Sequence, residues 1–141
     1  MKLAYISSLD ENVTSGGAHL RITAIKRIYQ LLGLDCDEYY NDWPKNTFSL
    51  LPYLQSLYYG KQTRILFKRK NLVIKDTPII HLDNIRQFYW LDDPKSFLIY
   101  NAHNLEFENF YGREESSFKR RFEEYELDRI AQSDLTMVCS E

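Results

Sequence analysis

The sequence is poor in cysteine, and this excludes two classes of small protein. Only Cys36 and Cys139 are present, and each lies in an apolar run that is typical of a strand, where a free thiol behaves as a small hydrophobe. Two distant cysteines provide neither a disulfide framework nor the ligand spacing of a metal site. We therefore expect a protein of a reducing compartment that binds no metal.

Long apolar runs are also absent. No stretch approaches the roughly 20 apolar residues that a membrane-spanning helix needs. The N-terminus, Met1-Lys2-Leu3-Ala4-Tyr5-Ile6, is too short and too quickly polar for a signal peptide. We expect a cytoplasmic protein.

An excess of charge of one sign is the third absence. The 18 Lys and Arg residues nearly balance 20 Asp and Glu residues, so the net charge is -2. A chain without a positive excess has no general attraction for nucleic acid, and we expect no nucleic-acid partner. The length of 141 residues suits one domain with its own core.

Strand and helix patterns alternate along the chain. The first unit is an apolar strand at residues 3–6, a loop with Gly16-Gly17, and a helix whose stripe of Leu20, Ala24, Ile28, Leu31 and Leu32 predicts its buried face. Further strands are expected at residues 34–40, 78–82, 97–100 and 135–139, and further helices at residues 49–59 and 114–132. This alternation predicts a Rossmann-like, doubly wound α/β fold, with a mostly parallel sheet of about five strands flanked by helices.

Polar residues follow several of the expected strands. His81 and Asp83 lie at the end of one strand, and His103, Asn104 and Glu106 follow the next. Ligands of open parallel sheets bind beyond the carboxyl ends of the strands, so these residues are candidates for a site. For His81, inside a strand, a structural role in the core is the competing interpretation.

Gly16 and Gly17 precede the first helix. Two glycines there let backbone N–H groups approach a phosphate, with the helix dipole behind them. A simple tight turn is the alternative. The segment matches neither the dinucleotide-binding glycine pattern nor a P-loop.

The segment Tyr100-Asn101-Ala102-His103-Asn104-Leu105-Glu106, with the Glu-rich helix and the Ser-Asp-Leu-Thr-Met-Val-Cys-Ser strand after it, resembles a known family. It is similar to the N-terminal domain of family 4 glycosyltransferases, which have the GT-B fold. Glu126, Ser133-Asp134 and Ser140 stand at matching places, and Ser15-Gly16-Gly17-Ala18 with Arg21 is similar to the family's glycine loop. Residues 43–75 carry none of the likeness.

The resemblance implies a two-domain, retaining, metal-independent enzyme with no cofactor. Residues 1–141 would be its N-terminal, acceptor-side domain, and the C-terminal donor-binding domain lies outside this chain. The substrates would be a nucleotide sugar and a saccharide or lipid-linked acceptor. Without the second domain, or a partner subunit in its place, we expect no sugar transfer.

The resemblance also implies roles for single residues. His103 would meet the donor sugar near its transferring carbon, and the backbone of Gly16 and Gly17 would stabilise the diphosphate leaving group. The acceptor or a phosphate is expected to contact Arg21, His81, Asp83, Asn104 and Glu106.

A segment that mixes basic, aliphatic and aromatic side chains suggests contact with an anionic membrane, where a lipid-linked acceptor would be found. Its residues are Tyr58, Tyr59, Lys61, Arg64, Lys68, Arg69 and Lys70. Such contact would place the protein at the inner face of the membrane. A solvated helix with a buried stripe is the competing interpretation.

Two other functions remain open on the sequence. One is a non-catalytic subunit that binds a partner and completes a site across the interface. The other is a flavodoxin-like binding module. A receiver-type version of that module needs an acidic cluster after the first strand, where this chain has Ser7 and Ser8.

Overall fold

The computed structural model describes residues 1–7, 17–40, 50–61, 63, 74, 77–90, 95–102 and 104–138, and the structural statements below concern these. Several residues singled out in the sequence lie outside them, namely Gly16, Arg64, Lys68, Arg69, Lys70, His103, Cys139 and Ser140.

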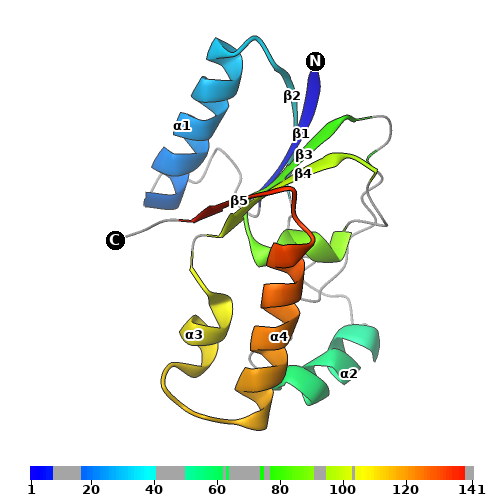
Figure 1. Ribbon diagram of the computed structural model, residues 1–141, viewed down its shortest axis with the longest axis vertical. Helices are drawn as coiled ribbons and strands as arrows, with labels where there is room; N and C mark the ends of the chain where they lie inside the picture. Colours follow the sequence, from blue (N-terminus) through cyan, green and yellow to red (C-terminus); the bar gives the residue numbers. More distant parts are fainter. Residues whose placement is uncertain are drawn as a thin grey trace.

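Five parallel strands form one sheet with the order β2-β1-β3-β4-β5 (Figure 1). The elements in chain order are β1 (Lys2–Ser7), α1 (Gly17–Leu31), β2 (Asp35–Tyr40), α2 (Leu50–Tyr59), β3 (Ile79–Leu82), the 3₁₀ helix η2 (Ile85–Trp90), β4 (Phe97–Ala102), α3 (Glu106–Tyr111), α4 (Ser117–Ala131) and β5 (Leu135–Val138). The predicted Rossmann-like, doubly wound α/β fold is confirmed.

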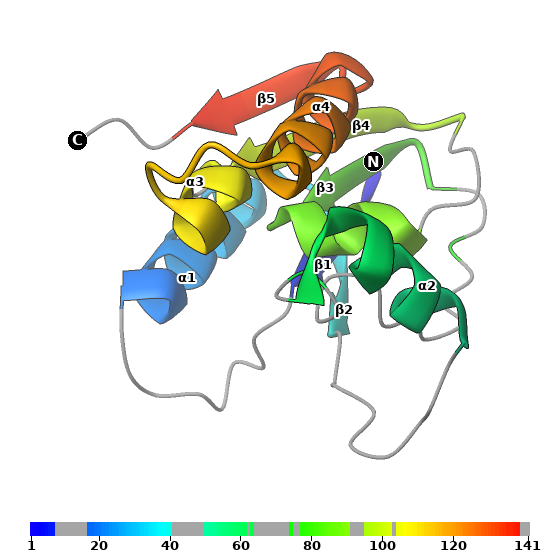
Figure 2. The ribbon, with the colours of Figure 1, turned by 90° about the horizontal axis from the view of Figure 1, so that it is seen from below.

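Helices cover both faces of the sheet, because alternate residues of each strand point to opposite sides. Leu3 and Tyr5 of β1 pack against Ile22 and Tyr29 of α1. On the other face the larger core cluster combines residues of β1, β3 and β4 with η2, α3 and α4. Figure 1 shows α1 on one side of the sheet and α3 and α4 on the other, and Figure 2 gives the view from below.

The buried face of α1 differs from the predicted one. Leu20 and Leu31 of the predicted stripe are 72% and 74% exposed, whereas Ile22 and Tyr29 are buried. Both sets recur at helical spacing, so the helix has two apolar edges. On this second edge Ile22 and Tyr29 pack in the same core cluster as residues of β1, and the hydroxyl of Tyr29 shares a hydrogen bond of 2.6 Å with Nδ1 of the buried His81.

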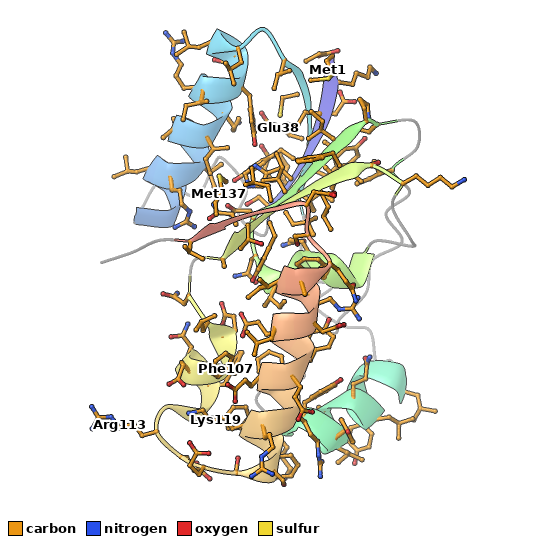
Figure 3. The ribbon with its side chains drawn as sticks, in the orientation of Figure 1. Met1, Glu38, Phe107, Arg113, Lys119 and Met137 are labelled. Atoms are coloured by element: carbon orange, nitrogen blue, oxygen red, sulfur yellow. The ribbon has the colours of Figure 1, made fainter. Side chains whose placement is uncertain are left out.

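Helix α4 packs on the core through Phe122, which is fully buried. Its N-cap is Ser116, whose hydroxyl accepts a hydrogen bond from the backbone N–H of Lys119. Lys119 also contacts α3 and the residue that follows it. Lys119 Nζ donates to the carbonyl oxygen of Gly112 at 2.6 Å and lies 3.1 Å from Glu108 Oε1, on the side of α4 that faces α3 (Figure 3).

No helix within the described ranges is long and apolar enough to cross a bilayer.

A buried carboxylate fixes the start of α3. Glu126 of α4 is fully buried, and its two oxygens accept the backbone N–H groups of Glu106 and Phe107, each at 3.0 Å. These N–H groups belong to the first turn of α3, which has no partners for them within the helix. Helix α4 thereby positions the segment that follows β4.

We predict that the stability of the protein depends on the protonation of Glu126. Burial raises the pKa of this carboxyl from 4.5 to about 6, against the opposing effect of the two backbone N–H groups. The protonated side chain therefore contributes stability that is complete below pH 4.5 and is lost as the pH rises through about 6.

Urea unfolding of the wild type and of Glu126→Gln between pH 7 and pH 4.5 checks this. The free energy of unfolding of the wild type should rise relative to the variant as the pH falls, by up to about 2 kcal/mol. A difference that stays constant over this range would contradict the prediction. A carboxyl-carbon NMR titration gives the pKa directly.

Candidate functional site

The candidate site lies at the carboxyl ends of β1, β3 and β4, on the face of the sheet that α1 covers. Asp83 directly follows β3, and its backbone N–H continues the ladder to the carbonyl oxygen of Ile6 at 2.9 Å. Its side chain is only 2% exposed. The hydroxyl of Ser7 donates to Oδ2 and the amide of Asn101 donates to Oδ1, both at 3.4 Å.

Arg21 brings a positive charge to the same place from α1. Its Nε lies 4.0 Å from Oδ1 of Asp83, and its side chain is 28% exposed. We call Ser7, Arg21, Asp83 and Asn101 the edge cluster. In this cluster Arg21 is the residue that reaches solvent. The buried carboxylate of Asp83, held by Ser7 and Asn101, carries the negative charge that orients the guanidinium of Arg21.

The topology of the sheet makes this edge the candidate for a binding site. From β1 the chain first adds β2 on one side and then returns to add β3 on the other. In such sheets the connections diverge at the switch point between β1 and β3, and ligands bind in the crevice outside the carboxyl ends of these strands. Ser7 ends one of the two strands and Asp83 follows the other.

His81 lies one layer deeper than the edge cluster. Its ring is fully buried between Tyr29 and the edge of Tyr5, whose ring centroid is 4.9 Å away. Burial, with the Asp83 carboxylate as the second cause, raises the pKa of Tyr5. Burial also raises the pKa of Tyr29 to about 12. His81 thus lies beneath the edge cluster, in the core. Its contact with an acceptor stays a prediction.

The remaining candidates are connected to the edge through α3. Asn84, next to Asp83, donates its side-chain amide to Glu106 Oε1 at 3.2 Å. Glu106 is buried at the start of α3, whereas Asn104 is exposed. The structure therefore brings Arg21 and Asp83 together, and it joins Glu106 to them through Asn84.

Among the glycines, Gly17 is the first residue of α1, one turn before Arg21. The N-terminal end of α1 thus lies close along the chain to Arg21, the half-buried cation of the edge cluster. Both the helix dipole and the guanidinium favour an anion at this end of the sheet. The phosphate contact proposed for Gly17 stays a prediction.

Two members of the cluster, Ser7 and Asn101, were not among the residues predicted from the sequence. Their signal is the two-residue period of the strands: Ser7 follows Tyr5 and Asn101 follows Ile99 on the same face. A polar residue at the end of an otherwise apolar strand face indicates the edge of the sheet. The sequence analysis named Glu126 only for the resemblance and predicted no contact for it, because its hydrogen bonds join segments about 20 residues apart.

Within the part of the chain that the structure describes, no group of three His, Cys, Asp or Glu side chains could hold a metal ion. The edge cluster instead combines one carboxylate, one hydroxyl, one amide and one guanidinium. These groups hydrogen-bond sugar hydroxyls and pair with phosphates.

A scan against protein-family models and searches of curated proteins and of solved structures each returned no match. The functional argument therefore rests on the residues themselves.

We predict that Tyr29→Phe destabilises the protein by about 1–3 kcal/mol, because it removes the hydrogen-bond partner of a fully buried histidine nitrogen. The matched control is Tyr58→Phe, which removes a hydroxyl from an exposed ring and should cost less than about 0.5 kcal/mol. Urea unfolding followed by circular dichroism measures both. Equal losses in the two variants would show that the bond to His81 is unimportant for stability.

Proposed function

We propose that this chain is the acceptor-side half of a retaining glycosyltransferase, which transfers a sugar from a nucleotide-sugar donor to a saccharide or lipid-linked acceptor. The observation that supports it most is the edge cluster at the switch point between β1 and β3. The segment that resembles the glycosyltransferase family includes the end of β4 and the start of α3.

The chemistry of the cluster suits such substrates. A sugar presents hydroxyl groups, which carboxylates and amides recognise, and a nucleotide sugar adds a diphosphate, which a guanidinium recognises. In our proposal Arg21 contacts the ligand, and Asp83 is a positioning residue that acts through Arg21. The backbone at the start of α1 would stabilise the negative charge that develops on the departing diphosphate.

His103 is the proposed catalytic residue. It follows Ala102, the last residue of β4, in the sequence, and it lies outside the described residues. In our proposal it meets the donor sugar near its transferring carbon. A second domain would hold the nucleotide across the cleft, and this chain alone would not transfer sugar.

A flavodoxin-like binding module is the second candidate, because the strand order β2-β1-β3-β4-β5 is also the order of flavodoxin-like sheets. Asp83 follows the third strand, where a receiver-type module has its phosphoacceptor. The first strand, however, ends in the buried hydroxyl of Ser7 rather than in the acidic residues that a receiver uses to hold a cation.

The proposal is tested in the enzyme that contains this domain together with its second domain. Release of nucleotide from UDP-, GDP-, ADP- and dTDP-linked sugars is measured for the wild type and for His103→Ala. We expect turnover to fall by about 100-fold or more, as for the loss of one group that stabilises the transition state. Leu31→Glu, on the exposed edge of α1, is the control and should keep wild-type turnover.

Two outcomes count against the proposal. If folded His103→Ala retains turnover within a few-fold of the wild type, the role of His103 is wrong. If no nucleotide sugar is consumed and the isolated chain binds a flavin mononucleotide, the flavodoxin-like module is the better description.

A further inference from the structure

Helix α2 presents its apolar stripe to solvent rather than to the core. Its exposed large side chains recur at steps of three and four residues, and they are Leu50, Tyr53, Leu54, Leu57 and Tyr58. The opposite face carries Ser56, which is buried, and the half-buried Tyr59. An amphipathic helix normally buries its apolar stripe, so the orientation of α2 is the reverse of the usual one.

Specific contacts hold α2 in this orientation. The ring of Tyr59 packs against Phe122 and Tyr125 of α4, with centroids 6.1 and 5.5 Å away. The hydroxyl of Tyr111 donates to the carbonyl oxygen of Tyr59. Arg121 Nη1 donates to the carbonyl oxygen of Tyr58 at 2.8 Å. These contacts join the C-terminal end of α2 to α3 and α4, and they hold the helix with its apolar stripe facing outward.

The exposed surface continues onto the start of α4. The guanidinium of Arg121 lies 4.5 Å from the ring centroid of Tyr58 and 5.7 Å from that of Phe118, whose ring is exposed. We define the α2 patch as Leu50, Tyr53, Leu54, Leu57, Tyr58 and Phe118.

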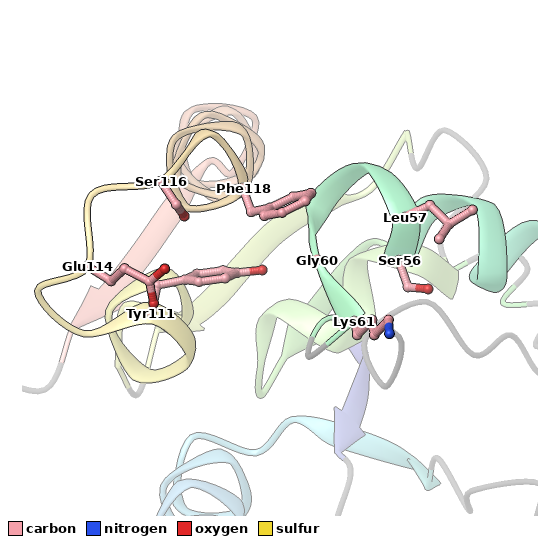
Figure 4. A pocket seen from close by; sticks show the side chains of 8 residues that line it. All are labelled: Ser56, Leu57, Gly60, Lys61, Tyr111, Glu114, Ser116 and Phe118. Carbon is pink, nitrogen blue, oxygen red and sulfur yellow. The ribbon is translucent and has the colours of Figure 1, made fainter.

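A hollow of about 380 Å³ opens beside the α2 patch, between α2 and the start of α4 (Figure 4). Leu57 and Phe118 of the patch line it, together with Tyr111. Lys61 and Glu114 are its charged residues. None of the edge-cluster residues lines this hollow, so the patch and the candidate site are separate surfaces.

Charge indicates what covers the patch. Residues 43–75, which include all of α2, contain seven of the 18 Lys and Arg residues of the chain and none of its 20 Asp and Glu residues. Lys61 lies two residues beyond the end of α2, and Arg121 lies against Tyr58. A fixed apolar stripe in a basic segment is complementary to a surface that is both apolar and anionic.

We propose that the α2 patch docks onto an anionic lipid bilayer. The leucines enter the boundary between headgroups and acyl chains, and Lys61 and Arg121 contact lipid phosphates. Tyr53 and Tyr58 suit this depth, because tyrosine prefers the membrane–water interface. Of the two tyrosines expected from the sequence to contact a membrane, only Tyr58 faces outward. The proposal does not require the chain to transfer sugar.

Vesicle co-sedimentation of this chain tests the proposal. The vesicles are phosphatidylcholine alone and phosphatidylcholine with phosphatidylglycerol. Leu54→Glu places a charge in the middle of the patch at a side chain that is 51% exposed, and Leu31→Glu makes the same change on α1. Lys61→Glu is a second variant that leaves the apolar stripe intact. Circular dichroism establishes that each variant is folded.

We expect binding that requires phosphatidylglycerol and that weakens about tenfold or more in Leu54→Glu and in Lys61→Glu, but not in Leu31→Glu. Binding that ignores phosphatidylglycerol, or that is equal in Leu54→Glu and Leu31→Glu, would overturn the proposal. Concentration-dependent dimerisation that Leu54→Glu abolishes, without vesicle binding, would overturn it in favour of a second copy of the chain. The test measures vesicle binding and dimerisation only, so its outcome does not depend on whether the chain takes part in sugar transfer.

Discussion

The buried carboxylate of Asp83 is the constraint on which the carboxyl edge of the sheet depends. A carboxylate removed from water is tolerated only where hydrogen bonds and an opposite charge compensate it. Asp83 has a hydroxyl from β1, an amide from β4 and a guanidinium from α1. These partners come from three separate elements, so satisfying one charge fixes how β1, β4 and α1 meet at the switch point. The only one of them that extends to solvent is Arg21, and its position follows from this arrangement.

A second buried carboxylate, Glu126, extends the organised region to the segment after β4. Its oxygens hold the first two N–H groups of α3, and Glu106 at that point accepts the amide of Asn84, the neighbour of Asp83. Polar contacts thus run from the edge cluster through α3 to the core of α4. A candidate site of this kind is preorganised, because buried, hydrogen-bonded residues fix the position of the side chain that reaches solvent.

The sequence predicted the strands and the longer helices well. The period of the apolar residues and the length of each apolar run indicate whether a segment is buried on one face or on both. It could not choose between the two apolar edges of α1, since the choice depends on Tyr29 meeting His81, which is 52 residues away. It also could not show that the apolar stripe of α2 faces solvent. Periodicity identifies the residues that share one face of a helix, but not whether that face packs on the core. The ion pair of Lys119 with Glu108 could not be predicted either, because Glu108 lies on α3, a helix that the sequence did not predict. Of the edge cluster, the sequence singled out Asp83 and Arg21 as candidates, while Ser7 and Asn101 required the register of the sheet.

The central claim is that ligands bind at the switch point between β1 and β3. The most direct measurement is a titration of the ¹⁵N-labelled chain with sugar 1-phosphates, followed by amide chemical shifts in the wild type and in Arg21→Ala. The account predicts shift changes clustered at Ser7, Arg21, Asp83 and Asn101, and their loss in Arg21→Ala. Changes clustered instead around Tyr111 and Phe118, changes that persist in Arg21→Ala, or no changes up to the solubility of the ligands would contradict it.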